Sequence, residues 1–376
     1  MNARVFTGIA SRNIAATHLK SIAFVTFVLL TVAIAIDLAQ TIEDIRTKAA
    51  DENISLLPLM LEYLLYRSAD ILARLLPMAC LAGSFIAELL RHQRMENVIL
   101  GAAGAPPTLI FAALVGVGAV TGTLQATLEG WVRPAAVFAQ VDLQIGTYAK
   151  RFRQGELGTQ WILEGDRAIQ ARILRSDDPK LHDLRVFEGV GDVDLRRIIS
   201  ASRAEPAEAD GQWTLFDVTV WQGSEGNTMF PTQYEQLSLP LALTKTHLQY
   251  FGILGFYLPN APLHQIAAVK GAEQTPDAET AVMRRLVAWI LPGVFAFLGA
   301  SLAQAGHNGR FFAWWRLLSL GAFGYICLVS VKSFWALGEF GVLSPLAATT
   351  TPLIFAMLAG ILIQLRLNGA PRRQKP

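Results

Sequence analysis

The sequence is poor in charged residues and in cysteine, and each shortage excludes some classes of protein. Only 16% of its 376 residues are Asp, Glu, Lys or Arg, whereas a soluble domain carries about a quarter. Cys80 and Cys327 both lie in apolar runs, which excludes a disulfide framework or cysteine zinc site and favours buried thiols. The net charge of +2 gives no field that would attract nucleic acid.

The motifs of common membrane and ATP-using enzymes are also absent. The phosphate-binding pattern G-x-x-x-x-G-K-[ST] does not occur, nor do H-E-x-x-H and G-x-S-x-G. His182 and His247 stand far apart without clustered partners, whereas a metal site needs several converging ligands. We therefore expect no catalytic residue, no metal site and no cofactor bound by this chain.

Apolar residues, in contrast, make up 52% of the chain and gather in six runs. A helix needs about 20 such residues to cross about 30 Å of hydrocarbon. The predicted spans are Ser21–Ala39, Ile71–Leu90, Pro107–Leu128, Val282–Ala303, Leu317–Leu337 and Leu346–Leu365. We expect the first to be retained as an anchor, because no small-residue cleavage site ends it.

Lysine and arginine in the short loops predict the orientation of these spans. The N-terminal segment, the loop between the fourth and fifth runs and the C-terminal tail carry basic residues and no acid. Acidic residues outnumber basic ones between the first and second runs. We therefore expect both termini to lie in the cytoplasm and the long polar region after the third run to lie outside.

That polar region has the pattern of β-structure. Stretches such as TQWILEGDRAIQARILR, QWTLFDVTVWQG and YEQLSLPLAL are rich in β-branched and aromatic residues, with Gly, Asp and Pro between them. We predict an α-helical membrane protein with six transmembrane helices in a 3 + 3 arrangement. Residues 1–133 form the first helical half, residues 134–276 an extracytoplasmic all-β, jelly-roll-like domain, and residues 277–376 the second helical half.

A short charged segment, RHQRMENVILGAAGAP, separates the second and third runs. A cytoplasmic amphipathic helix in about residues 91–105 can dock into a groove of a soluble partner through apolar contacts and orienting charges. The apolar contacts would come from Met95, Val98 and Ile99, and the charges from Arg91, Arg94 and Glu96. The alternative is a solvated turn beside a span.

Three motifs resemble those of the LptF/LptG family of lipopolysaccharide export permeases. MENVILGAAG places Glu96 and Gly104 on the glutamate and the closing glycine of a family pattern, although Gly101 stands where an arginine is sometimes found. EGWVRP, from Glu129 to Pro134, is similar to an LptG-type motif and favours that type. FGVLSPLAATTTPLI resembles the family pattern before the last span. Together with the six-span layout, the resemblance extends over the whole chain.

The resemblance implies a fold, partners and a mechanism. It implies a permease in the bacterial inner membrane that pairs with an LptF- or LptG-like paralogue. An LptB-like ATPase dimer would use ATP and Mg²⁺ and drive lipopolysaccharide from the membrane into periplasmic β domains. An LptC-like periplasmic bridge protein would receive the lipid.

The sequence departs from the family at the end of the first span, where lysines are often found. Asp37, Gln40 and Thr41 stand there instead, and Lys48 comes only later. The candidates for contacts with the lipid are Lys332, Arg74 and Lys48 for phosphates, and Phe216, Val218 and Val220 for acyl chains. Lys332 either faces the lipid or extends to the interface. Arg74 either binds lipid or pairs with Asp70, four residues before it.

Other functions remain open on the residues alone. A permease of another ATP-driven exporter, such as a lipoprotein-releasing system, would share the membrane spans but generally has four. A membrane enzyme would need a catalytic constellation, and a scaffold without transport activity would need none of these sites.

Overall fold

The structure is a computed structural model that describes residues 8–106, 108–152, 154–176, 178–191, 195–207, 211–224, 228–308, 311–312 and 314–367. Pro107, where the third span was predicted to begin, and the tail at 368–376 lie outside the described residues. The chain forms two compact units. The helical unit comprises Met1–Ala149 and Met283–Pro376, and the β unit comprises Lys150–Val282.

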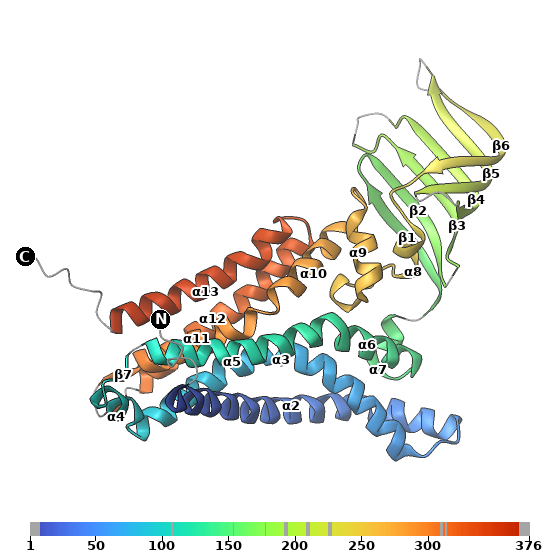
Figure 1. Cartoon of the computed structure of the whole chain (residues 1–376). Coiled ribbons are helices and arrows are strands. Elements are labelled where there is room, and N and C mark those ends of the chain that lie inside the picture. The colour runs from blue at the N-terminus through green and yellow to red at the C-terminus, as the bar shows by residue number, and fades with distance from the viewer. Residues whose placement is uncertain are drawn as a thin grey trace, which may run out of the picture. The chain divides into compact units, whose positions relative to one another are not determined.

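The helical unit is built from long apolar helices (Figure 1). Before the β unit these are α2 (Ile9–Asp51), α3 (Leu56–Gln93), α4 (Glu96–Ala102), α5 (Thr108–Thr127), η1 (Leu128–Val132), α6 (Arg133–Asp142) and α7 (Gly146–Arg151). The chain returns to the helical unit within α10 (Thr275–Val287). There follow α11 (Leu291–Ala305), the short strands β7 (His307–Asn308) and β8 (Phe311–Phe312), α12 (Trp314–Glu339) and α13 (Pro345–Leu367).

Among the described residues, five helices are long and apolar enough to cross a membrane, and a sixth crossing exists if a bent pair counts as one span. The bent pair replaces the single straight span predicted at Val282–Ala303. α10 and α11 meet there at an angle of 60°, and Pro292 lies in the first turn of α11, where a ring without an N–H is tolerated. The structure thus supports a multi-pass membrane protein, while an equal 3 + 3 division stays a prediction.

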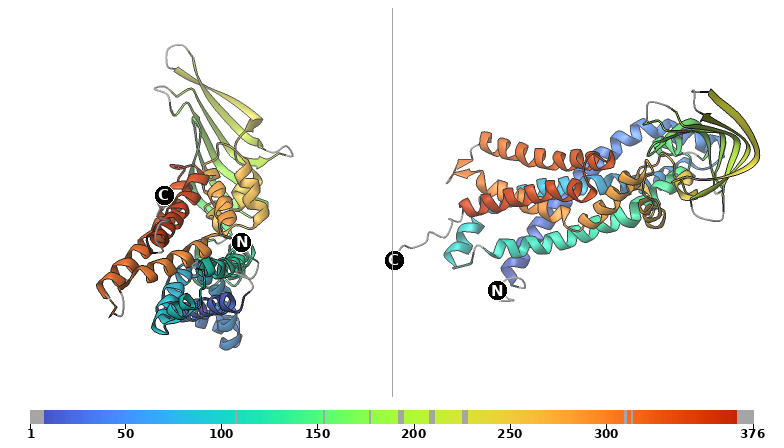
Figure 2. Two further views of the ribbon diagram at one scale, coloured as in Figure 1. Left: turned by 60° about the vertical axis from the view of Figure 1, so that its left-hand side comes forward. Right: turned by 90° about the horizontal axis from the view of Figure 1, so that it is seen from above.

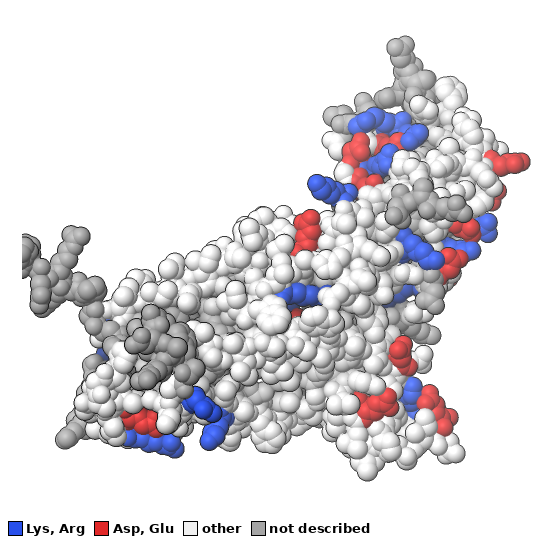
Figure 3. All heavy atoms as spheres, viewed as in Figure 1, with Lys and Arg blue, Asp and Glu red and all other residues white. Residues whose placement is uncertain are grey.

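The surface of the helical unit is apolar over much of its length. On α2, Phe24, Phe27 and Ile36 are exposed, although a large apolar patch on a soluble protein would be costly. Figure 3 shows largely uncharged surface between the charges near α4 and those near the turn from α2 to α3. This pattern is typical of helices that face lipid. Cys80 and Cys327 are free, buried thiols, as the sequence predicted.

Glycines allow α11 to approach α3 and α5 closely. A Cβ at Gly299 would lie 2.2 Å from the carbonyl oxygen of Leu81 on α3. A Cβ at Gly118 of α5 would lie 3.0 Å from the Cα of Gly293 on α11. Small residues at such crossings let helix backbones pack by van der Waals contact in a membrane, where the hydrophobic effect offers little. The segments before and after the β unit are therefore packed into one body.

The β unit contains one six-stranded antiparallel sheet with the order β1-β2-β3-β4-β5-β6. The strands are β1 (Gly155–Glu164), β2 (Arg167–Arg175), β3 (Lys180–Glu188), β4 (Arg197–Pro206), β5 (Gln212–Ser224) and β6 (Thr228–Pro240). Every strand pairs with its neighbour in sequence, and Figure 2 shows that the sheet is strongly curved. This is a meander, so the predicted jelly-roll-like arrangement is not confirmed for the described strands.

One face of the sheet forms the core of the β unit, and the side chains that reach it change parity along the strands. In β5, Trp213 and Leu215 are buried, and after Asp217 the buried residues are Val218 and Val220. Asp217 has a positive φ of 52°, which interrupts the regular alternation. Asp183 in β3 has a φ of 50°, and the buried positions of that strand change parity in the same way. A strict two-residue pattern therefore fails in these strands.

The β unit continues through α8 (Lys245–Gln249), η2 (Gly255–Tyr257) and α9 (Asn260–Ala268). The Trp213 indole N–H donates to the Leu243 carbonyl at 2.7 Å. His247 is fully buried, and its Nδ1 lies 2.8 Å from the Thr244 hydroxyl within a capping box that begins α8. Burial lowers the pKa of His247 to about 4. These contacts give His247 a structural role at the start of α8.

Candidate functional site

Two buried carboxylates near opposite ends of the predicted second span mark the polar sites of the helical unit. Asp70 and Glu88 both lie on α3, and their exposed fractions are 0% and 1%. A rise of 1.5 Å per residue separates them by about 27 Å. A buried carboxylate is stable only with cations or hydrogen-bond donors around it. The partners of each carboxylate therefore define a site.

The segment near Glu88 contains the short helix α4, at the same end of the helical unit as the C-terminal end of α13 (Figure 1). The chain leaves α3 through Met95, whose φ of 58° is unusual for a side chain of this size. α4 ends at Ala102 and is followed, after the C-cap residue Ala103, by Gly104, whose φ is 76°. The N–H groups of Gly104 and Ala105 donate to the carbonyls of Gly101 and Leu100, which is a Schellman motif. Gly104 is thus explained by the backbone that it allows.

None of the residues of α4 is buried. Met95, Val98 and Ile99 are 49%, 58% and 63% exposed, and Arg94 is exposed as well. An exposed apolar patch on a short helix is typical of a surface that a partner covers. The structure therefore presents the apolar residues that the sequence singled out, and no partner chain tests the docking role.

Arg91, in contrast, points into the protein. The sequence prediction counted it among the partner-facing charges, but its exposed fraction is 1%. Its guanidinium donates to Glu88 at 2.5 Å, to Glu96 at 3.1 Å and to Asn97 Oδ1 at 2.9 Å. The planar fork of arginine suits such a threefold contact. Arg91 thus ties α4 to α3 from inside.

Glu88 extends this contact to other helices. His18 Nε2 of α2 lies 2.9 Å from Glu88 Oε1, and Gln304 Nε2 of α11 donates to Glu88 Oε2 at 3.0 Å. Gln304 Oε1 in turn accepts from Gln364 of α13 at 2.8 Å. We call the residues His18, Glu88, Arg91, Glu96, Asn97, Gln304 and Gln364 the Glu88 network. It joins α2, α3 and α4 to helices that follow the β unit.

A cavity lies beside this network. Its volume is about 360 Å³, and Arg91, Asn97, Gln304 and Gln364 contribute polar groups to its wall. Leu100 of α4 and Leu367 of α13 contribute apolar ones. The space between α4 and the helical body is therefore incompletely filled, and polar contacts hold α4 more than side-chain packing does.

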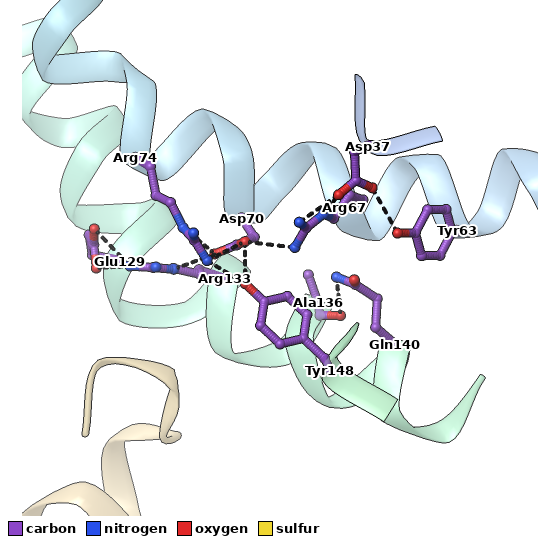
Figure 4. A network of polar contacts seen from close by, with 10 residues as sticks. All are labelled: Asp37, Tyr63, Arg67, Asp70, Arg74, Glu129, Arg133, Ala136, Gln140 and Tyr148. Carbon is purple, nitrogen blue, oxygen red and sulfur yellow. Dashed lines mark hydrogen bonds and ion pairs between the residues drawn. The ribbon is translucent and has the colours of Figure 1, made fainter. Parts of the chain in front are cut away.

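The second site surrounds Asp70 (Figure 4). Arg74 and Arg133 donate to its carboxylate at 2.8 Å each, Arg67 at 3.2 Å, and the Tyr148 hydroxyl at 2.6 Å. The i, i+4 pair of Asp70 with Arg74 that the sequence offered as an alternative is thus present. The Arg74 guanidinium is therefore paired with the buried Asp70 carboxylate.

Two further carboxylates balance the arginines around Asp70. Asp37 of α2 accepts from Arg67 at 2.7 Å and from the Tyr63 hydroxyl at 2.7 Å. Glu129 accepts from Arg133 at 3.0 Å, and both belong to the EGWVRP motif. We call Asp37, Tyr63, Arg67, Asp70, Arg74, Glu129, Arg133 and Tyr148 the Asp70 network. Its three guanidinium groups pair with three carboxylates. Asp37, the acid at the end of the predicted first span, therefore belongs to an internal ion pair.

The remaining phosphate candidates differ in their surroundings. Lys48 donates to the Leu143 carbonyl at 2.6 Å and pairs with Glu52 at 3.3 Å. Lys332 is exposed on α12. Nothing in the described part of the chain tests whether either one binds a lipid.

The structure separates the three residues proposed to line a groove for acyl chains. Val218 and Val220 lie on the core face of the sheet, with exposed fractions of 1% and 7%. Phe216 is only partly buried, and the Arg203 guanidinium lies 4.6 Å from its ring centre. The positive φ of Asp217 explains why these residues do not share one face. Trp213 and Leu215 take the place of Phe216 on the core face.

Sequence reasoning missed Glu88, His18 and Gln304, because their partners are distant along the chain. A signal existed in each case, namely a polar residue inside or beside an apolar run, which is costly without a partner. Glu129 and Arg133 were noticed only as a motif, although their i, i+4 spacing predicts an ion pair. Among the described residues, no group of His, Cys, Asp or Glu could hold a metal ion.

Comparison with known proteins identifies one family. Residues 12–366 match the family described as lipopolysaccharide export system permease LptF/LptG. No match was found among curated proteins.

Proposed function

The chain belongs to the LptF/LptG family of lipopolysaccharide export permeases, and from that premise we propose that it is the permease subunit of an ATP-driven exporter. It takes lipopolysaccharide from the outer leaflet of the inner membrane and passes it to a periplasmic bridge. Both termini lie in the cytoplasm and the β unit lies in the periplasm. The partners are an LptB-like ATPase dimer, an LptF- or LptG-like paralogue and an LptC-like bridge protein. The choice of LptG over LptF stays a prediction.

The observation that carries this proposal is α4. Its exposed Met95, Val98 and Ile99 suit a groove on the ATPase, because burial of apolar side chains supplies docking energy. Glu96 uses one carboxylate oxygen for Arg91, and its other oxygen is available to a basic residue of the partner. Arg91 acts from inside by holding Glu96 in place.

The test is co-purification of the ATPase with variants of α4. We expect Ile99→Asp to reduce recovery of the ATPase at least about tenfold, because a charge would enter an apolar contact. Val190→Asp is a matched control, since Val190 is exposed in the β unit. Glu96→Lys should also weaken the complex by about 2–5 kcal/mol if its pair is desolvated. Normal recovery with both α4 variants would refute the docking role.

We propose that Lys332 contacts a phosphate of the lipid. It is exposed on an apolar helix, and a charge in such a place is favoured when it meets an anion. Lys332→Ala should lower lipid-stimulated ATPase activity but leave assembly and basal ATPase activity unchanged, and Lys332→Arg should retain more activity. Equal transport by the alanine variant and the unmodified protein would make Lys332 an interfacial anchor.

The core face of the β unit is the proposed path of the acyl chains. Photocrosslinkers at Leu215, Val218 and Val220 should trap lipopolysaccharide in an ATP-dependent manner, whereas one at Phe216 should not. Equal crosslinking at all four positions would contradict this path. If acylated proteins are trapped in place of lipopolysaccharide, the chain is a lipoprotein-releasing permease, and if no lipid is trapped a scaffold role gains support.

A further inference from the structure

α4 lacks the apolar anchor that normally fixes a helix on a protein. None of its residues is buried, and the cavity of about 360 Å³ lies behind Leu100 and Gly101. A helix of seven residues is also too short to be stable by itself. Its position must therefore depend on the polar contacts that reach it from α3.

Those contacts come through Arg91. Its guanidinium holds Glu96 at 3.1 Å and Asn97 at 2.9 Å, and these two residues form the first turn of α4. The side chain is almost completely buried, so the contacts are little screened by solvent. Displacement of α4 therefore requires that Arg91 move or lose its partners.

Arg91 in turn depends on Glu88. A buried guanidinium needs a counter-charge, and Glu88 supplies it at 2.5 Å. The same carboxylate contacts His18 of α2 and accepts from Gln304 of α11. Gln364 of α13 then donates to both Gln304 and Ser301 of α11.

We propose that Glu88 is a positioning residue that holds α4 in place through Arg91 and links its movement to α2, α11 and α13. A displacement of Glu96 or Asn97 would move the Arg91 guanidinium and, with it, the Glu88 carboxylate. That carboxylate contacts helices that precede and follow the β unit. This inference rests on the proposed docking of an ATPase on α4, and it assigns the internal route by which docking reaches the membrane helices.

The first test needs no partner. Amide hydrogen exchange is measured on the purified full-length chain in detergent, with Glu88→Gln compared with Asp70→Asn. Both carboxylates lie on α3 and are buried, so Asp70→Asn is a matched control. We expect Glu88→Gln to raise exchange in residues 96–102 about tenfold, since loss of their anchor promotes local opening. Asp70→Asn should leave α4 unchanged and raise exchange in α6.

A second variant distinguishes loss of the α4 anchor from misfolding of the whole chain. The double variant Glu88→Gln with Arg91→Gln removes both buried charges and leaves only the Glu96 carboxylate, whose side chain is 23% exposed to solvent. It should restore the thermal stability but keep the fast exchange of α4, and Glu88→Asp should restore slow exchange in part. Slow exchange of α4 in the folded double variant would overturn the proposal. This readout is independent of the ATPase, so failure of docking is recognised separately by co-purification.

A third readout tests the link to function. Lipid-stimulated ATPase activity is measured in the assembled complex for Glu88→Gln, Glu96→Gln and their combination. If both residues belong to one route, the loss of activity in the combined variant should equal the larger single loss. Asp70→Asn should leave the loss caused by Glu96→Gln unchanged, because the Asp70 site is not part of the route. Losses that multiply for Glu88 and Glu96 would show two independent effects and overturn the route.

Discussion

Each end of α3 carries a buried carboxylate, and the groups that stabilise the two carboxylates differ. Asp70 is surrounded by three guanidinium groups and a phenol, all from residues that precede the β unit. Glu88 has one guanidinium, one imidazole and one amide, and the amide comes from Gln304 after the β unit. The Asp70 site is a local joint between α3, α6 and α7. The Glu88 site connects the two segments of the helical unit.

The difference shows that the partners of a buried carboxylate decide its role. It can hold neighbouring helices rigidly, or it can link distant segments of the chain. Charged partners on every side of Asp70 make each displacement costly, because each would separate opposite charges in a poorly screened place. Neutral partners such as Gln304 form weaker bonds, so the Glu88 network can change its contacts at a smaller cost. We therefore expect the Asp70 site to determine stability and the Glu88 site to determine coupling.

Asp70→Asn should have the largest effect on stability. It leaves Arg67, Arg74 and Arg133 without their shared carboxylate, and removal of one partner from a buried ion pair costs about 3–5 kcal/mol. Glu88→Gln should cost about 1–3 kcal/mol, because Arg91 keeps Glu96. The measurement is the unfolding transition of each full-length variant in the same detergent. Equal losses would remove the distinction between the two sites.

Exchange of arginine for lysine should have the next largest effect. Arg91→Lys keeps the charge but cannot reach Glu88, Glu96 and Asn97 together, so we expect a loss of about 1–3 kcal/mol. Arg74→Lys is the matched change at the other end, and its side chain is 42% exposed. It should cost less than about 1 kcal/mol. A larger loss for Arg74→Lys in thermal unfolding would reverse the comparison.

Tyr148→Phe removes one hydroxyl from the Asp70 site without changing its shape. The hydroxyl donates to Asp70 at 2.6 Å, and loss of such a bond costs about 1–2 kcal/mol. Lipid-stimulated ATPase activity should stay unchanged when it is measured below the unfolding temperature. Loss of coupling with unchanged stability would mean that the Asp70 site also transmits movement.

The smallest expected effect on stability comes from His247. This histidine differs from His18, which has a carboxylate partner. The pKa of His247 is lowered from 6.5 to about 4 by burial, so the unfolded state binds the proton first as the pH falls. Stability from the neutral imidazole is complete above pH 6.5 and declines between pH 6.5 and 4. We expect a loss of about 1 kcal/mol between pH 7 and 5.5.

The measurement for His247 is the pH dependence of unfolding of the β unit, followed by hydrogen exchange in the full-length chain. His247→Asn should lower stability at neutral pH and remove this decline. An unchanged decline in that variant would assign the pH dependence to another group.

The sequence was sufficient for features that depend on local pattern. Apolar runs predicted the membrane helices, and alternating β-branched residues predicted a β region between them, because both signals are repeated along the chain. Exposure of Val98 and Ile99 could be anticipated from an amphipathic segment between spans. The i, i+4 spacing also predicted the pair of Asp70 with Arg74.

The sequence was insufficient where the outcome depends on contacts between distant residues. Arg91 resembles any basic residue at the end of a span until Glu88 and Gln304 are placed beside it. A continuous apolar run at Val282–Ala303 does not reveal the 60° bend between α10 and α11. Asp217 adopts a positive φ that a two-residue pattern does not reveal. As a result, Phe216 was assigned to the same face as Val218.

The meander of the β unit has a consequence for biosynthesis. Each strand pairs with the strand made just before it, so the sheet has low contact order and none of its ladders waits for a later segment. A chain that leaves the ribosome from its N-terminus can complete this sheet before α12 and α13 are synthesised. The helical unit cannot be completed then, because Gly299 and Gln304 must first reach α3. The last helices can therefore join the helical unit after the β unit has folded.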